Sequence, residues 1–140
     1  MDFSHLLNAS VSGSMETTFT PVPEGDYLAR IETIEVRSVD TKNGVSPIAR
    51  LTWIVLDESL KASMDRDQIQ VFQDLWLDLD ATGALARGKD KNVGLGRVRR
   101  AVGQNDDGGE WNLGLLEGSS PAMVHIRHRQ DKNDPERIYA

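Results

Sequence analysis

The residues of this chain best suited to chemistry are two aromatic rings on the polar side of a predicted strand, residues 68–79. Phe72 and Trp76 fall on this side between glutamine and aspartate residues, where large rings need an explanation. Such rings stack on nucleic-acid bases of any sequence; the alternative is that an arm or a neighbouring subunit covers them. The opposite face of the strand is predicted to be buried, because every second residue is apolar except Gln73. These apolar residues are Ile69, Val71, Leu75, Leu77 and Leu79.

The rest of the sequence gives little indication of a catalytic site or a metal site. The chain contains no cysteine, which excludes disulfides, thiolate metal sites and a cysteine nucleophile. His125 and His128 are three residues apart, so a strand would place them on opposite faces, which makes them a poor metal pair. The spaced acids at 65–67 and 78–80 are a weak magnesium pattern, and no phosphate-binding loop or dinucleotide motif is present. We therefore expect no enzyme, no cofactor and no metal site.

Positive charge is concentrated in two regions, although the formal net charge of the chain is −6. Residues 1–40 and 56–80 each hold seven acidic and two basic residues, whereas residues 87–100 hold six basic residues and one acid. A second basic run near the end contains Arg127, Arg129 and Lys132 beside two histidines. A fold that brought the two runs together would create a cationic surface. Taken singly, each run is equally well explained as a solvated face.

The 140 residues suffice for one domain with a single hydrophobic core. We interpret residues 1–18 as an N-terminal arm, in which Phe3, Leu6 and Leu7 form a short turn, and residues 19–140 as the domain. No apolar run approaches the roughly 20 residues of a membrane span. These features predict a soluble protein of a reducing compartment, the cytoplasm, with no membrane partner.

The first predicted strand, residues 26–39, follows Pro21 and Pro23, which cannot donate hydrogen bonds to a sheet. Its apolar residues alternate, but the alternation shifts by one residue midway, which predicts a β-bulge and a strong bend. The two apolar sets are Tyr27, Ala29 and Ile31, followed by Ile34 and Val36. A long, bent first strand is typical of a small curled barrel.

The remaining elements follow from turn residues and periodicity. Asn43-Gly44 predicts a hairpin turn within residues 40–44. A helix is predicted between Asn92, as its N-cap, and Gly103, as its stop, with one apolar stripe, Leu95, Val98 and Val102. The other predicted elements are strands at 46–56 and 122–129, a polar connection at 57–67, a packed turn at 111–116, and a short last strand at 136–140 after a turn at 131–135.

This order predicts an all-β fold with a helical insertion. Three antiparallel strands, a helix and a two-stranded hairpin are the order of the OB-fold, a five-stranded Greek-key barrel whose second and third strands present a ligand face. The predicted core consists of Ile31, Leu51, Val55, Val71, Leu75, Leu77, Val98, Val124 and Ile126.

The chain resembles a family of phage-encoded single-stranded-DNA-binding proteins that was long described only as a domain of unknown function. The segments that carry the resemblance span nearly the whole chain and are MDFSHLL, PVPEGDYLARIETIEV, ARLTWIVLD, RVRRAVG and HIRHRQDKNDPERIY. The resemblance implies an OB-fold whose last strand is cut short at residue 140, because family members usually continue further. It also implies a protein that protects single-stranded DNA during phage replication or recombination in the host-cell cytoplasm.

The predicted DNA interface combines stacking rings with cations along the backbone path. Phe72 and Trp76 are the stacking candidates, whereas the parity of Trp53 with Leu51 and Val55 slightly favours a core position. Lys42 lies in the loop between strands one and two, which OB-folds use to grip oligonucleotides. The candidate cations are Arg30, Lys42, Arg50, Arg97, Arg100, His125, Arg127, Arg129 and Lys132.

Two other functions remain open on the sequence alone. The same barrel could be an interaction module that buries Phe72 and Trp76 in a homodimer or against a replication or recombination protein, which the negative net charge favours. The acidic segment 56–80 would suit an inhibitor that mimics DNA. Measuring the affinity at different ionic strengths distinguishes DNA binding from a hydrophobic contact. Phosphate contacts release counterions, so the affinity for DNA falls steeply with salt.

Overall fold

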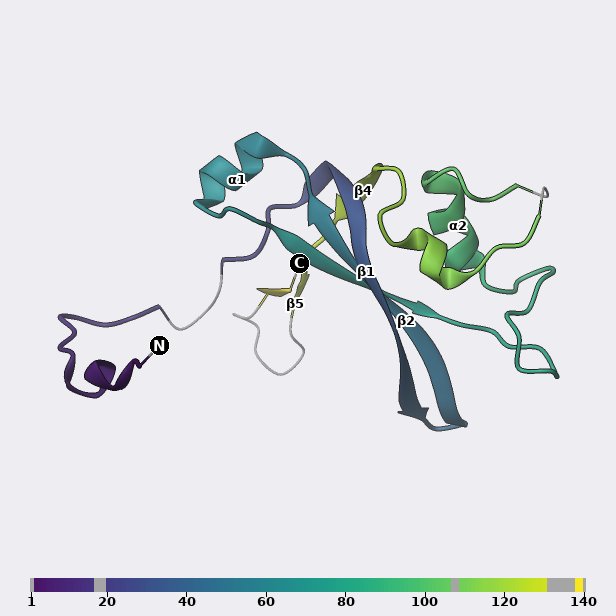
Figure 1. Cartoon of the computed structure of the whole chain (residues 1–140), viewed down its shortest axis with the longest axis horizontal. Helices are drawn as coiled ribbons and strands as arrows, with labels where there is room; N and C mark the ends of the chain where they lie inside the picture. The colour runs from purple at the N-terminus through teal and green to yellow at the C-terminus, as the bar shows by residue number, and fades with distance from the viewer. Residues whose placement is uncertain (1, 17–19, 107–108, 131–137, 140) are drawn as a thin grey trace.

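The computed structural model describes residues 2–16, 20–106, 109–130 and 138–139. Its centre is an antiparallel sheet of four strands in the order β3-β2-β1-β4 (Figure 1). The strands are β1 (Gly25–Thr41), β2 (Gly44–Val55), β3 (Gln70–Trp76) and β4 (Ala122–Ile126). The other elements are the helices α1 (Glu58–Met64) and α2 (Val93–Ala101), the 3-10 turns η1 (Ser4–Asn8) and η2 (Leu113–Leu116), and the pair β5 (Arg129–Gln130) and β6 (Ile138–Tyr139).

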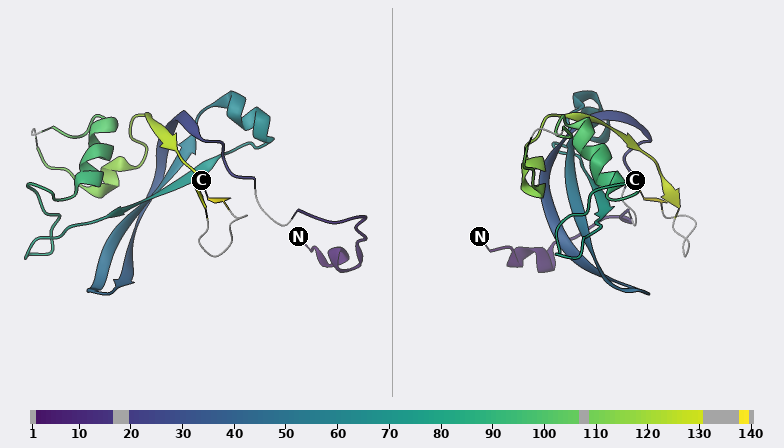
Figure 2. Two further views of the ribbon diagram at one scale, coloured as in Figure 1. Left: turned by 180° about the vertical axis from the view of Figure 1, so that it is seen from behind. Right: turned by 90° about the vertical axis from the view of Figure 1, so that its right-hand side faces the viewer.

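Strand β1 is long and bent, and the predicted bulge is confirmed. Ile31 pairs with Trp53 and Thr33 pairs with Thr52, so that Glu32 is the extra residue at which the register shifts. Beyond the bulge, β1 and β2 continue as a hairpin that projects from the rest of the molecule (Figures 1 and 2). The predicted Asn-Gly turn closes this hairpin, with Gly44 at a φ of 110° that favours glycine.

The core lies between the sheet, α2 and η2, with a second, smaller cluster beside α1. Seven of the nine predicted core residues are buried, and the other two, Val71 and Val124, are half-buried and pack against the core. Trp53 is only 4% exposed, and its Nε1 donates a hydrogen bond to Gln73 Oε1 at 3.0 Å. The core position that its parity favoured is therefore confirmed.

The helix predicted after Asn92 is present, but Asn92 does not act as the predicted side-chain cap. Leu95, Val98 and Val102 are buried on the expected face, and Gly103 follows with a φ of 76°. The Asn92 side chain instead accepts a hydrogen bond from Asp78 N and donates to the carbonyl oxygens of Asp78 and Ala86. It therefore ties the start of α2 to the chain that leaves β3.

Helix α1 was not predicted from the sequence, where residues 57–67 were interpreted as a polar connection. Asp57 caps this helix by accepting a hydrogen bond from Leu60 N at 3.0 Å, and Leu60 is buried in the smaller core cluster. The sequence does contain a pattern that indicates this helix: Asp57 is a suitable N-cap, and Leu60 and Met64 follow at helical spacing.

Strand β3 ends earlier than predicted, and Leu79 is 49% exposed rather than part of the buried face. Asp80 causes the difference, because its Oδ1 accepts hydrogen bonds from the backbone N–H groups of Thr82 and Ala84. These bonds turn the chain back, and Leu79 forms only an isolated bridge with Leu85.

The sheet is open, which differs from the predicted closed barrel of five strands. The predicted fifth strand, 136–140, lies largely outside the described residues, and its described part, Ile138–Tyr139, pairs with Arg129–Gln130 in a separate small sheet. The predicted fourth strand breaks after Ile126. At the break, His128 turns to the segment before β1, with Nε2 lying 2.6 Å from the carbonyl oxygen of Val22.

Candidate nucleic-acid interface

Phe72 and Trp76 project from the outer face of β3, as the alternation predicted. Their side chains are 59% and 58% exposed, and no segment of the described chain buries them. The register places Thr52 opposite Phe72 and Ile48 opposite Trp76, with Asp74 on the same face between the two rings. Two flat rings on one face, four residues apart on a strand, form a surface on which bases could stack.

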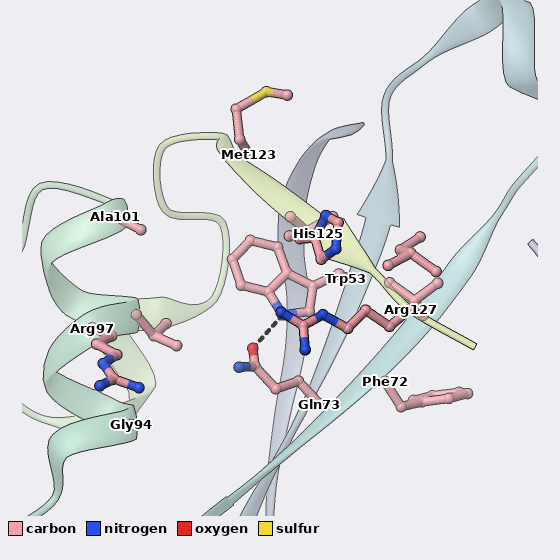
Figure 3. A pocket seen from close by; sticks show the side chains of 13 residues that line it. Trp53, Phe72, Gln73, Gly94, Arg97, Ala101, Met123, His125 and Arg127 are labelled. Atoms are coloured by element: carbon pink, nitrogen blue, oxygen red, sulfur yellow. Dashed lines mark hydrogen bonds between the residues drawn. The ribbon is translucent and has the colours of Figure 1, made fainter. Parts of the chain in front are cut away.

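A cleft of about 430 Å³ opens between β3, α2 and β4 (Figure 3). Trp53 lies at the floor of the cleft, and Phe72 lies at the β3 side. Val71 and Val98 are further apolar residues of its lining. Arg97 enters from α2, and His125 and Arg127 enter from β4 and its end. The described residues that line the cleft include no aspartate or glutamate. The fold therefore joins parts of both basic regions on one surface of an acidic protein.

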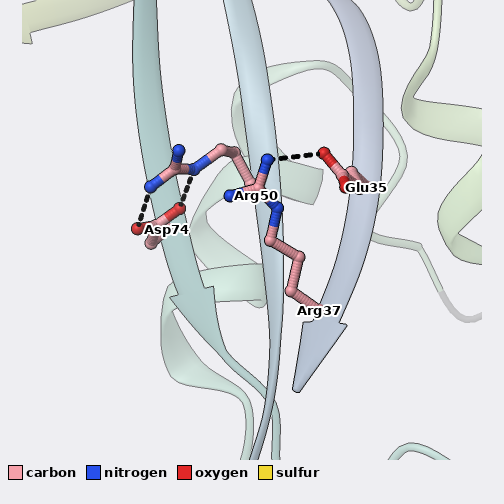
Figure 4. Close-up of polar contacts among 4 residues, drawn as sticks. All are labelled: Glu35, Arg37, Arg50 and Asp74. Atoms are coloured by element: carbon pink, nitrogen blue, oxygen red, sulfur yellow. Dashed lines mark hydrogen bonds and ion pairs between the residues drawn. The ribbon is translucent and has the colours of Figure 1, made fainter. Parts of the chain in front are cut away.

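Arg50 is held by a carboxylate on the outer face rather than left free for phosphate. Its Nε and Nη2 donate to Oδ1 and Oδ2 of Asp74 at 2.8 and 3.0 Å (Figure 4), and its guanidinium lies 5.5 Å from the centroid of the Phe72 ring. The hydrogen bonds from Arg50, followed by its charge, hold the pKa of Asp74 below its usual 3.8. Asp74 therefore stays ionised at neutral pH, and Arg50 contacts phosphate only by exchanging this partner.

A second ion pair lies beside the first. Arg37 Nη2 donates to Glu35 Oε2 at 2.9 Å (Figure 4), and this hydrogen bond and the positive charge of Arg37 lower the pKa of Glu35. Glu35 is the register partner of Arg50 on β1. The outer face around Arg50 is thus close to electrically neutral.

The other candidate cations are spread over the molecule. Arg100 is exposed on α2 but is not among the residues that line the cleft, and Arg30 is exposed on β1. Lys42 lies at the tip of the β1–β2 hairpin. Arg129 begins β5, whereas Lys132 lies outside the described residues. His125 lies beside a carboxylate, with Nδ1 2.6 Å from Asp26 Oδ1.

Arg99 has a structural role that the sequence pattern did not reveal. Its guanidinium lies 4.2 Å from the centroid of the Trp111 ring, and its Nε and Nη2 donate to the carbonyl oxygen of Gln104. Gln104 in turn accepts a hydrogen bond from Trp111 Nε1 at 2.8 Å. Of the six basic residues in the run 87–100, Arg99 is half-buried and packs, whereas the other five are exposed.

If this face binds single-stranded DNA, the change Asp74→Asn should strengthen the binding and steepen its salt dependence. The change Asp74→Asn removes the carboxylate that neutralises Arg50, so that one more cation can release a counterion, which adds about 0.7 to the slope of log affinity against log salt. Glu58→Gln is the matched control, because it also removes one negative charge but lies on α1, where Glu58 pairs with Lys61. Equal effects of the two variants would mean that only net charge matters.

In comparisons with known proteins, no protein-family model, no curated protein and no solved structure matches this chain. Within the described residues, no group of three or more histidine or acidic side chains is placed to hold a metal ion. No helix in the described ranges is both long and apolar enough to cross a membrane. Over the residues that it describes, the structure is mostly β, with an open four-stranded antiparallel sheet and two α-helices.

Proposed function

We propose that this protein binds single-stranded DNA with little sequence preference. The observation that carries the proposal is the position of β3, which displays Phe72 and Trp76 on its outer face and borders a cleft with Arg97 and Arg127 on its walls. Rings stack on every base, and cations follow the backbone without reading sequence. In this arrangement the bases lie on the rings, and the backbone crosses the edge of β3 into the cleft.

We further propose that the curled sheet is an OB-type barrel that is open between β3 and β4. The order of three strands, a helix and a fourth strand supports this interpretation, as does an outer face on β2 and β3 that carries the exposed rings. The resemblance to phage-encoded proteins supports a role in protecting single-stranded DNA during replication or recombination in the cytoplasm of a host cell.

A titration with oligo-dT at two salt concentrations tests the proposal. Binding should quench tryptophan fluorescence. The affinity should fall with salt, and each neutralised phosphate should add about 0.7 to the slope of log affinity against log salt concentration. No change in fluorescence or electrophoretic mobility at low salt would contradict DNA binding.

A protein-interaction module is the second candidate, and the paired charges of the outer face favour it. Because Arg50 and Arg37 are bound to Asp74 and Glu35, Phe72 and Trp76 stand on a face that is nearly neutral as well as partly apolar. Such a face suits a contact with protein, whose affinity changes little with salt. Salt-insensitive association through Phe72 and Trp76 would favour this function.

Because Arg97 lines the cleft and Arg100 does not, replacing each of these α2 residues by alanine should affect DNA binding differently. Arg97→Ala should lower the salt slope of DNA binding by about 0.7, because one phosphate contact is lost. Arg100→Ala removes the same charge from α2 but from a residue that does not line the described cleft, so its slope should stay unchanged. If both variants behave like the wild type, the charges of α2 are merely solvated.

A further inference from the structure

Residues 2–16 form an apolar and acidic arm in which every residue is exposed. Phe3, Leu6 and Leu7 are 57%, 60% and 88% exposed. Phe3, the residue before η1, and Leu6 are three residues apart, the spacing at which side chains align along a 3-10 turn, and Leu7 is next to Leu6. Val11 and Met15 continue the series of exposed apolar side chains. The arm contains Asp2 and Glu16 and neither lysine nor arginine. Exposed apolar side chains gathered in one segment are typical of a contact surface.

The base of the arm is attached to the body at a defined place. The carbonyl oxygen of Thr20 accepts a hydrogen bond from Arg66 Nη2 at 2.9 Å, and Val22 is buried in the smaller core cluster. From there the arm extends away from α2, so that the arm and α2 lie at opposite ends of the long axis of the molecule (Figures 1 and 2). The arm therefore points away from the α2 wall of its own cleft.

The cleft between β3, α2 and β4 is complementary to the arm in charge and polarity. Its floor is apolar, and its described lining includes Arg97, His125 and Arg127 without an acidic residue. An acidic apolar segment suits such a groove, since the apolar side chains leave water and the acids meet the arginines. A short helical turn with apolar residues at i, i+3 and i+4 is a common form of ligand for a groove of this kind.

We propose that the cleft of one molecule binds the Phe3, Leu6 and Leu7 face of the arm of a second copy of this chain. Exchange of two arms between two clefts closes a symmetric dimer and leaves no arm exposed. The bound arm then covers Arg97 and Arg127, the residues proposed to contact DNA. Dimer formation and DNA binding therefore compete. Only this last consequence rests on the proposed function.

Cross-linking between single-cysteine variants tests the proposal, because the chain has no cysteine of its own. Asn8→Cys marks the arm without altering its apolar face, and Met123→Cys marks the cleft in a second sample that carries a purification tag. Val36→Cys is the matched control, since Val36 and Met123 are 58% and 62% exposed and Val36 lies on the hairpin outside the cleft. A disulfide between the two variants differs in mass from a disulfide between two copies of one variant, because only one of the two samples carries the tag.

The pair Asn8→Cys and Met123→Cys should form mixed disulfides at least about tenfold faster than the pair Asn8→Cys and Val36→Cys, because a docked arm raises the effective concentration of the thiols. Equal rates would overturn the proposal. A monomeric internal disulfide in a chain that carries both Asn8→Cys and Met123→Cys, without mixed disulfides between the single variants, would show that the arm enters its own cleft and would also overturn it. The experiment contains no nucleic acid, so its outcome is independent of DNA binding.

The double change Leu6→Gln and Leu7→Gln supplies a second measurement. Both side chains are exposed, so the variant should unfold at the same denaturant concentration as the wild type. Sedimentation should show a concentration-dependent dimer for the wild type and loss of that dimer for the variant. A wild-type protein that stays monomeric at all concentrations, or a variant that dimerises equally well, contradicts arm exchange.

Discussion

Replacing Trp76 by alanine should weaken binding to single-stranded DNA by about 1–3 kcal/mol, if the ring stacks on one base. This loss corresponds to about 5- to 150-fold in affinity. The effect is large because stacking on an exposed ring is not replaced by any other contact when the ring is removed. Stability should change by less than about 1 kcal/mol, the usual size of a cross-strand contact such as the one between Trp76 and Ile48.

Fluorescence anisotropy with labelled oligo-dT measures the affinity of the Trp76→Ala variant, and denaturant unfolding measures its stability. Trp76→Phe should retain most of the affinity, because phenylalanine still offers a flat ring. The same variant should lose most of the tryptophan quenching, since Trp53 is buried and Trp111 is half-buried beneath Arg99. Unchanged DNA affinity in Trp76→Ala would remove Trp76 from the interface.

Replacing Trp53 by alanine should destabilise the protein by about 3–5 kcal/mol, the usual range for removing a buried aromatic side chain. Trp53 packs in the main core cluster and is 4% exposed, so its loss leaves a cavity and also leaves Gln73 without the hydrogen bond from Trp53 Nε1. Because small domains are stable by only about 5–15 kcal/mol, this change could unfold a sizeable fraction of the protein.

The midpoint of denaturant unfolding measures this effect. Trp53→Phe is the control, because it keeps an aromatic ring in the core and should cost much less than Trp53→Ala. A Trp53→Ala variant that keeps its stability but loses DNA affinity would show that Trp53 serves as a stacking platform rather than as a core residue.

Local patterns in the sequence determined much of the sheet. The alternation along residues 68–79 placed Phe72 and Trp76 on the exposed face, and the one-residue shift between Ile31 and Ile34 located the bulge. The Asn-Gly turn likewise located the β1–β2 hairpin. These features follow from the amino-acid sequence because side-chain direction in a strand repeats every two residues, and turn geometry depends on only a few neighbouring residues.

The pairing of charges and the shape of the cleft were decided by the tertiary structure. Arg50 and Asp74 are 24 residues apart in sequence and meet only because the β2–β3 register sets them opposite each other. Arg97 and Arg127 share a cleft only because β3, α2 and β4, which are separated in the sequence, come together around it in the fold (Figure 3). No local pattern specifies such contacts, since they depend on how several elements pack together. The sequence alone therefore determined that Phe72 and Trp76 stand on the exposed face of β3, and the packing of strands and helix decided which exposed residues act together.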